Sequence, residues 1–190
     1  MEKLYITAND LLNDAFLLGF RILDSGFRPD LLLAVWRGGT PVAIAIQELL
    51  DYRGVDHRHF VIRTCHYKGI DDRRDDIELQ GLEHALAACD NGGGNINNIL
   101  IVDDVHDTGL STATIITALE RHFGQHRPDI RVATAYFKPA KNRTAYVPDY
   151  FVHSTDKWIV FPHELIGLSG DEIAAGKRVP ALVRLADDRD

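Results

Sequence analysis

Two adjacent carboxylates, Asp103 and Asp104, are the residues in this sequence with the clearest capacity for chemistry. They follow Ile99-Leu100-Ile101-Val102, an apolar run typical of a buried strand, so both side chains are expected where that strand emerges. Two neighbouring carboxylates repel each other unless cations or hydroxyl groups receive them. An isolated Asp-Asp pair is more often an exposed turn or a helix N-cap, so the interpretation depends on the residues that follow.

A phosphate-binding segment follows the acidic pair. Thr108-Gly109-Leu110-Ser111-Thr112 opens a helix predicted for residues 112–123, where free backbone N–H groups, hydroxyls and the positive end of the helix dipole converge. Gly109 permits a positive φ and a close approach of the backbone. The segment has no Walker lysine and so differs from a P-loop. The sequence therefore predicts a phosphate ligand here, which need not be a nucleoside triphosphate.

Strands and helices alternate along the chain that carries these residues. The apolar patterns predict helices over 7–25, 42–50, 82–88 and 112–123, and strands over 31–36, 59–63, 99–102 and 130–137. Thr40 is expected to cap the second helix, with Pro41 in its first turn. The segment 64–80 is too charged and aperiodic for a core and predicts a long mobile loop. Ser169 is expected to begin a capped helix in the tail.

This alternation predicts an α/β fold, with a parallel sheet flanked by helices on both faces. Ligands of such sheets bind beyond the carboxyl ends of the strands, so the loops at 37–39, 64–80 and 103–111 should share one rim. The 190 residues are 45% hydrophobic and carry a net charge of -7, which favours one globular domain and disfavours nucleic-acid or anionic-membrane partners. Two separated cysteines, no leader pattern and no long apolar run favour a cytoplasmic protein.

Residues 99–109, Ile-Leu-Ile-Val-Asp-Asp-Val-His-Asp-Thr-Gly, resemble the phosphoribosyl-pyrophosphate signature of type I phosphoribosyltransferases. The resemblance implies that Asp103 and Asp104 hold the ribose diol of that donor, directly or through Mg²⁺. It also implies that six residues wrap the 5′-phosphate: Asp107, Thr108, Gly109, Leu110, Ser111 and Thr112. His106 stands where the family has an apolar residue, and we expect a partly packed side chain that points away from the phosphate.

Two further segments resemble the donor-binding parts of this family. Arg37-Gly38-Gly39 is similar to the loop whose backbone amides grip pyrophosphate, and its form is closest to bacterial xanthine-guanine enzymes. A simple tight turn is the alternative. Within 64–80, Tyr67 and Lys68 resemble the family's mobile lid, which would close over a cationic transition state and exclude water.

The acceptor side resembles the hypoxanthine and xanthine-guanine members. Lys138 falls where such enzymes read the exocyclic oxygen of a 6-oxopurine, although a solvated strand-end lysine is the alternative. Residues 157–164 resemble the segment in which an aromatic side chain, here Trp158, stacks on the base and the next backbone, at Ile159, recognises its edge. A buried core tryptophan is the alternative for Trp158. Glu164 is a weaker candidate for a magnesium or water ligand.

The resemblance thus implies transfer of a phosphoribosyl group to hypoxanthine, guanine or xanthine, with Asp107 accepting or sharing a proton of the purine imidazole ring. Orotate and adenine are less favoured acceptors, because their enzymes usually carry Thr-Gly-Gly in the cradle. A regulatory protein that binds the donor without turnover is the competing hypothesis. We expect one domain, with a core at 28–165 and a hood from 1–27 and 166–190, and a homodimer or homotetramer.

Overall fold

The computed structural model describes residues 2–66, 77–91, 95–177 and 179–183. The chain divides into two compact units, a larger one of Asp14–Asp156 and a smaller one of Met1–Asn13 with Lys157–Asp190. The predicted arrangement of a core at 28–165 under a hood from both termini remains a prediction. Among the described residues, no helix combines the length and the apolar character needed to cross a membrane.

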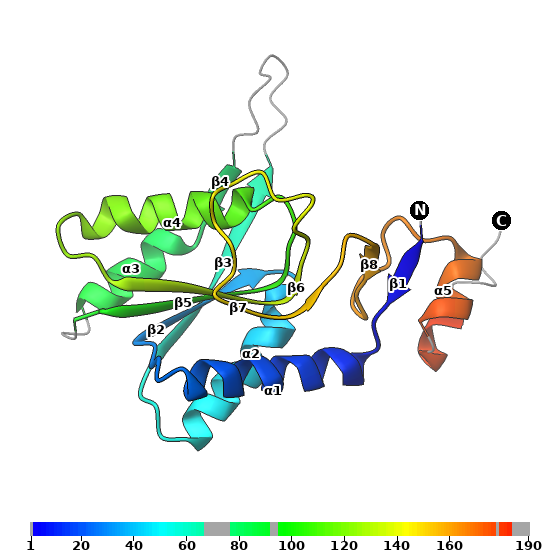
Figure 1. Ribbon diagram of the computed structural model, residues 1–190, viewed down its shortest axis with the longest axis horizontal. Helices are drawn as coiled ribbons and strands as arrows, with labels where there is room; N and C mark the ends of the chain where they lie inside the picture. The colour runs from blue at the N-terminus through cyan, green and yellow to red at the C-terminus, as the bar shows by residue number, and fades with distance from the viewer. Residues whose placement is uncertain (1, 67–76, 92–94, 178, 184–190) are drawn as a thin grey trace, which may run out of the picture. The chain divides into compact units, whose positions relative to one another are not determined.

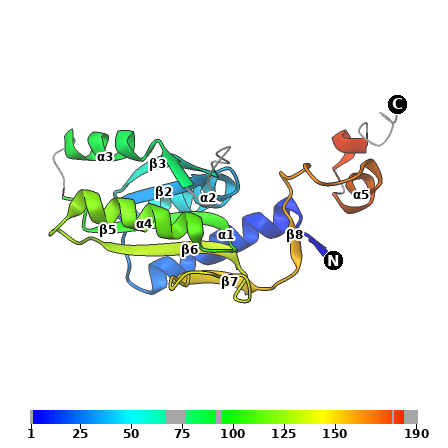
Figure 2. The same cartoon turned by 90° about the horizontal axis from the view of Figure 1, so that it is seen from above.

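A six-stranded sheet lies at the centre of the larger unit (Figure 1). Its strands run in the spatial order β4 (Ile77–Gln80), β3 (Arg58–His66), β2 (Leu31–Trp36), β5 (Asn98–His106), β6 (Asp129–Phe137) and β7 (Tyr150–Ser154). Figure 2 shows the succession from β3 to β7 across the sheet. Neighbouring strands are parallel except β3 and β4. The predicted α/β class with a mostly parallel sheet is confirmed.

Helices cover both faces of this sheet (Figure 1). One face carries α3 (Leu82–Asn91) and α4 (Leu110–Phe123), and the other carries α2 (Gly39–Tyr52) and the part of α1 (Ala8–Asp24) that belongs to the larger unit. The chain passes from β2 to β3 on one side and returns to β5 on the other side of β2. The carboxyl ends of β2 and β5 therefore form a topological switch point, where α/β sheets bind ligands.

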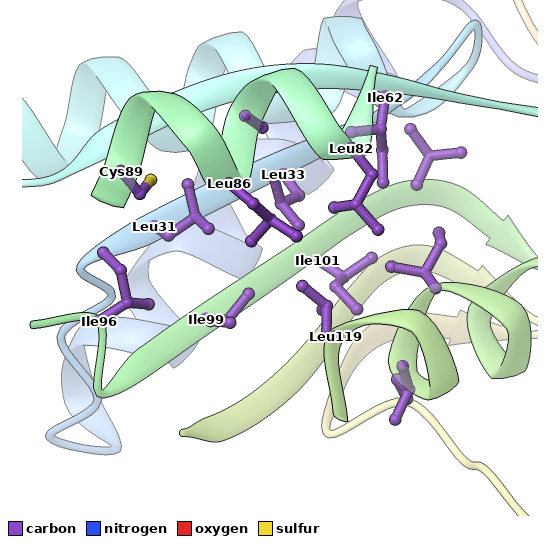
Figure 3. Close-up of a cluster of buried hydrophobic side chains, with 14 of the residues drawn as sticks. Leu31, Leu33, Ile62, Leu82, Leu86, Cys89, Ile96, Ile99, Ile101 and Leu119 are labelled. Carbon is purple, nitrogen blue, oxygen red and sulfur yellow. The ribbon is translucent and has the colours of Figure 1, made fainter. Parts of the chain in front are cut away.

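β2 is apolar along its whole length, and β5 is apolar from Ile99 to Val102, because both faces of the sheet are covered there. Figure 3 shows side chains of β2 and β5, such as Leu33 and Ile101, packed with Leu82 and Leu86 of α3 and Leu119 of α4. Successive strand residues point to opposite faces, so the equally buried Leu32 and its neighbours on β5 pack toward α1 and α2. This two-sided burial fixes the ends of β2 and β5 relative to each other.

Two local predictions were wrong. The segment 64–80 is not a loop throughout, because Thr64–His66 continues β3 and pairs with β4 as an antiparallel hairpin. Alternating half-buried and exposed residues in Ile77–Gln80 are typical of an edge strand, a signal that the charged residues before it obscured. Thr40 does not cap α2, because the helix already begins at Gly39 after Gly38, which makes no side-chain cap.

The smaller unit contains the parallel pair β1 (Lys3–Tyr5) and β8 (Trp158–Val160), the helix α5 (Gly170–Gly176) and the short 3-10 helix η1 (Pro180–Val183). Ser169 and Glu172 form a capping box at α5, which confirms the predicted capped start. Glu172 also pairs with Lys3, so α5 is tied to β1.

Candidate active site

The acidic pair lies within β5, and not after it as predicted. β5 continues to His106 because its pairing with β6 extends to the register pair His106 and Phe137, whereas its pairing with β2 stops at Val102. From Asp103 onward, the edge of β5 toward β2 is therefore free of a neighbouring strand. Asp104 is buried, Asp103 is half-buried, and its Oδ1 accepts a hydrogen bond from the Asp104 backbone N–H at 2.9 Å.

The glycine loop after β2 packs directly against this acidic pair. A Cβ atom added at Gly38 would lie 1.8 Å from Asp104 Oδ2, and one added at Gly39 would lie 2.4 Å from the Val102 carbonyl oxygen. Both positions therefore require glycine for close approach. Arg37 is exposed beside them. The predicted Arg37-Gly38-Gly39 loop and the predicted carboxylates thus meet at the switch point.

The predicted phosphate cradle consists of the turn 107–109 and the first turn of α4. Gly109 has φ 77°, in the left-handed region that favours glycine. A cavity of about 290 Å³ lies there, lined by Asp103, Val105, His106, Asp107, Thr108, Gly109, Ser111 and Thr112. A larger cavity of about 540 Å³, beside the second half of α4, contains none of the predicted site residues.

Burial, and after it the charge of Asp104, raise the pKa of Asp103 well above its ordinary value. A carboxyl group in such surroundings favours its charged form only when a cation is near. Among the described residues, no group of three or more His, Cys, Asp or Glu side chains could hold a metal ion by itself. Two carboxylates fit Mg²⁺, which takes its remaining ligands from water and substrate phosphates.

Asp107 is paired with two lysines from the segment that follows β6. Lys138 Nζ donates to Asp107 Oδ2 at 3.2 Å, and Lys141 Nζ lies 3.8 Å from the same oxygen. Lys138 is only 6% exposed. The other oxygen, Asp107 Oδ1, is buried and has no hydrogen-bond partner within the described part of the chain. The ion pair thus joins Lys138 and Asp107, which the sequence analysis singled out separately. It leaves Asp107 Oδ1 available to accept a hydrogen bond or a proton.

The predicted orientation of His106 was wrong. Its side chain lines the cradle cavity and lies beneath Gly109, where its Nε2 would be 2.9 Å from an added Cβ. Only 2% of the residue is exposed, and its ring meets Phe137 edge to face. The reason is the length of β5. The predicted strand ended at residue 102, so His106 was expected in the loop, whereas the observed strand extends to His106 and places its side chain beneath the turn at Gly109.

Of the predicted purine-binding residues, Lys138 belongs to the larger unit, whereas Trp158 and Ile159 belong to the smaller one. Trp158 is 47% exposed at the start of β8, which excludes the alternative of a buried core tryptophan, and Ile159 is buried. Glu164 Oε2 accepts a hydrogen bond from the Phe161 backbone N–H at 3.2 Å. The magnesium role of Glu164 stays a prediction. The lid residues Tyr67 and Lys68 lie outside the described residues.

Sequence reasoning missed several residues that support the cradle. Ser111 Oγ donates to Thr64 Oγ1 of β3 at 3.3 Å, and the Arg143 backbone N–H donates to the Thr108 carbonyl at 2.9 Å. Asn142 and Thr144 lie against Gly109. The polar, basic run after Lys138 was the available signal, because such a run after a buried strand is typical of a functional loop.

Comparisons with known proteins agree with this geometry. A family model described as phosphoribosyl transferase domain matches residues 9–165. The crystal structure of a purine phosphoribosyltransferase from Pyrococcus horikoshii Ot3 is 29% identical over 88% of this chain and 98% of that chain, with a TM-score of 0.65.

Two more distant structures support the fold alone. A hypothetical protein from Neisseria gonorrhoeae, solved with bound ppGpp, is 19% identical over 98% of this chain and 96% of that chain, with a TM-score of 0.66. The Helicobacter pylori xanthine-guanine-hypoxanthine phosphoribosyltransferase is 18% identical over 84% of this chain and 92% of that chain, with a TM-score of 0.63.

Proposed function

The chain belongs to the phosphoribosyltransferase family, as its residues 99–109 predicted, and on that premise we propose that it is a purine-salvage enzyme. It moves the 5-phosphoribosyl group of phosphoribosyl pyrophosphate to hypoxanthine, guanine or xanthine and releases the nucleoside monophosphate and pyrophosphate. The pairing of Lys138 with Asp107 at the mouth of the cradle carries this proposal. Its support from relatives is the 29% identity to the Pyrococcus purine enzyme.

The donor is held by the larger unit. The turn 107–109 and the first turn of α4 offer backbone N–H groups, including those of Ser111 and Thr112, and the hydroxyl of Thr108 to the 5′-phosphate. Asp103 and Asp104 orient the ribose hydroxyls, and the backbone amides of the Arg37 loop receive the pyrophosphate. Asp103 and Asp104 would hold Mg²⁺, which would supply positive charge to neutralise part of the pyrophosphate.

The acceptor is read by Lys138 and activated by Asp107. A departing pyrophosphate leaves an oxocarbenium-like ribose, so negative charge close to the ring lowers the barrier. Asp107 Oδ1 receives or shares the proton of the purine imidazole ring, while Oδ2 stays bound to Lys138. The Lys138 ammonium donates to the exocyclic oxygen of the base. A 6-amino purine lacks that acceptor and is disfavoured.

Trp158 and Ile159, in the smaller unit, are the remaining residues that the resemblance assigns to the base. The half-exposed indole of Trp158 stacks on the purine, and the backbone at Ile159 recognises its edge. Glu164 is a further magnesium or water ligand. We expect the enzyme to act in the cytoplasm as a homodimer or homotetramer.

The test is turnover of phosphoribosyl pyrophosphate and Mg²⁺ with hypoxanthine, guanine, xanthine, adenine and orotate, following nucleotide and pyrophosphate together. Release of both products with a 6-oxopurine is the expected result. Turnover with adenine or orotate alone would contradict the assigned acceptor. Donor binding without turnover on any base would instead favour a regulatory protein of the same fold.

A further inference from the structure

His106 is a buried polar side chain that the proposed reaction does not use. Its Nδ1 lies 3.3 Å from Thr112 Oγ1, in the first turn of α4. Its ring packs edge to face on Phe137, with 5.6 Å between ring centroids. The side chain therefore joins β5 and β6 to the helix that opens the phosphate cradle.

The Nε2 side of the ring faces the loop that supports Gly109. A methyl group added at Gly109 would meet Thr144 Oγ1, Asn142 Oδ1 and His106 Nε2, all within 2.9 Å. Asn142 is held in place because its Nδ2 donates to the Tyr146 carbonyl at 2.8 Å and its Oδ1 accepts from the Thr144 backbone N–H at 3.1 Å. These bonds direct the amide oxygen of Asn142, and not its NH₂ group, toward the turn.

The surroundings select one tautomer of the imidazole. Nε2 is buried without a hydrogen-bond partner among the described residues, and the amide oxygen on its side of the ring can only accept, so we expect Nε2 to carry the proton and Nδ1 to be the acceptor. The hydroxyl of Thr112 must then donate to Nδ1, and a hydroxyl has only one proton to donate.

We propose that His106 is a positioning residue for the 5′-phosphate site. As the Nε2–H tautomer it accepts, at Nδ1, the hydrogen bond of the Thr112 hydroxyl, so Thr112 anchors the start of α4 and donates nothing to the ligand. On its other side, the ring holds the Gly109 turn against the Asn142 loop. The phosphate is then bound by backbone amides and by the hydroxyl of Thr108, because the Ser111 hydroxyl already donates to Thr64. This inference rests on the proposed function only for the identity of the phosphorylated ligand.

The direct test is the protonation of the ring in the full chain. Long-range ¹H–¹⁵N correlations of His106, assigned by comparison with the variant His106→Gln, should show a protonated Nε2 and an unprotonated Nδ1. A protonated Nδ1 with a bare Nε2 would overturn the proposal. This measurement needs no turnover and no variant that must remain active.

The second test is a double-mutant cycle with ribose 5-phosphate as the probe, measured by calorimetry. Loss of one anchoring hydrogen bond should weaken binding about three- to tenfold in His106→Ile and in Thr112→Val. Because both changes break the same contact, the double variant should bind about as well as either single one. His106→Asn, whose amide oxygen can stand in for Nδ1, should retain more affinity than His106→Ile. His122→Ile, on the exposed end of α4, is the matched control and should bind as the unchanged protein does.

Steady-state constants separate this inference from the proposed function. His106→Ile should raise the KM for phosphoribosyl pyrophosphate and leave the KM for the purine within about twofold. Additive losses in the cycle, or equal changes in both KM values, would contradict the positioning role while leaving the transferase proposal intact. The opposite outcome is a protein that turns over no base but in which His106→Ile, Thr112→Val and the double variant all lose the same affinity for ribose 5-phosphate. That result would support the positioning role and contradict the transferase proposal.

Discussion

Asp107 combines two properties that rarely occur in one surface carboxylate. One oxygen is held by Lys138, and the other is buried without a hydrogen-bond partner among the described residues. A buried oxygen without a hydrogen-bond partner lowers the stability of the folded protein. Such an atom is explained when a bound ligand supplies the missing hydrogen bond. The purine N–H group is that partner in the proposed reaction.

Asp107→Asn should lower kcat by about 10²–10⁴-fold, the usual range for loss of a general base. The amide keeps the size of the side chain but cannot take a proton, so binding of phosphoribosyl pyrophosphate should change little. Comparing kcat with the donor dissociation constant from calorimetry checks this. If donor affinity and turnover fell together by the same factor, Asp107 would be a binding residue only.

Lys138→Met should discriminate between acceptor bases. The change removes a charged hydrogen bond to the exocyclic oxygen, which is worth about 1.5–3 kcal/mol, so kcat/KM for hypoxanthine should fall about ten- to 100-fold. The KM for the donor should stay nearly constant. Lys141→Met is the matched control, because Lys141 is farther from Asp107, at 3.8 Å, and more exposed. Equal effects of the two changes would contradict the special role of Lys138.

At the level of elements, the site depends on how closely β2 and β5 bring their following loops together. Gly38→Ala should disrupt this contact, because the new methyl would lie 1.8 Å from Asp104 Oδ2 and must displace that carboxylate. We expect magnesium-dependent donor binding to weaken at least tenfold and stability to fall by about 1–3 kcal/mol, as for other overpacked sites.

Calorimetry and thermal unfolding measure the two effects of Gly38→Ala. Gly19→Ala is the control, because its methyl meets only the tip of the flexible Leu49 side chain, at 2.7 Å. Unchanged donor affinity in Gly38→Ala would show that the glycine loop and the acidic pair do not form one site.

The tail helix α5 offers a second test at this level. Lys177 is buried and donates to the carbonyl of Phe161, next to the segment predicted to bind the base. Lys177→Met leaves that carbonyl unpaired, which should cost about 1–3 kcal/mol of local stability. Amide hydrogen exchange should therefore speed up at residues 158–164 and stay unchanged in β5. An equal increase in the exchange rate in residues 158–164 and in β5 would contradict a local role for α5.

Local patterns predicted the long buried elements well and the pairing of their ends poorly. β2 lies at 31–36 as predicted, because six consecutive apolar residues are typical of a strand covered on both faces. β5 runs four residues past its predicted end, because its partner β6 continues where β2 stops. The length of β5 is thus set by its pairing with β6, which is distant in sequence. The prediction for the orientation of His106 was wrong for this reason. The three-residue strands β1 and β8 join residues more than 150 positions apart, which no local pattern reveals.

For the molecule as a whole, the predicted donor-binding residues lie in the larger unit, whereas the predicted purine-binding residues are divided between the two units. Residues 37–39, 103–104, 107–112 and 138, which the resemblance assigned to the donor and to the exocyclic oxygen of the base, all belong to the larger unit. Trp158, Ile159 and Glu164 belong to the smaller one. Donor binding should therefore be measurable separately from base recognition, as the experiments on Asp107 and Lys138 assume.

The ligand-free molecule should be less stable than its fold allows, because its active site concentrates negative charge. Burial and the neighbouring Asp104 raise the pKa of Asp103 above its ordinary value, so the folded protein holds this proton more tightly than the unfolded chain does. The stabilising effect of that proton is complete below the unfolded pKa and is lost as the pH rises through the folded pKa. Above that window, the ionised carboxylate opposes folding.

Asp103→Asn should therefore raise the melting temperature of the ligand-free protein by a few degrees at neutral pH, and by progressively less as the pH falls toward the unfolded pKa. The same change should abolish the stabilisation that Mg²⁺ and phosphoribosyl pyrophosphate give together, because a ligand that binds only the folded state raises its stability. Thermal unfolding over a series of pH values, with and without both ligands, measures the two effects at once. If ligand-free Asp103→Asn melted at a lower temperature than the unchanged protein, the Asp103 side chain would stabilise the fold. The prediction that its carboxylate destabilises the ligand-free protein would then be wrong.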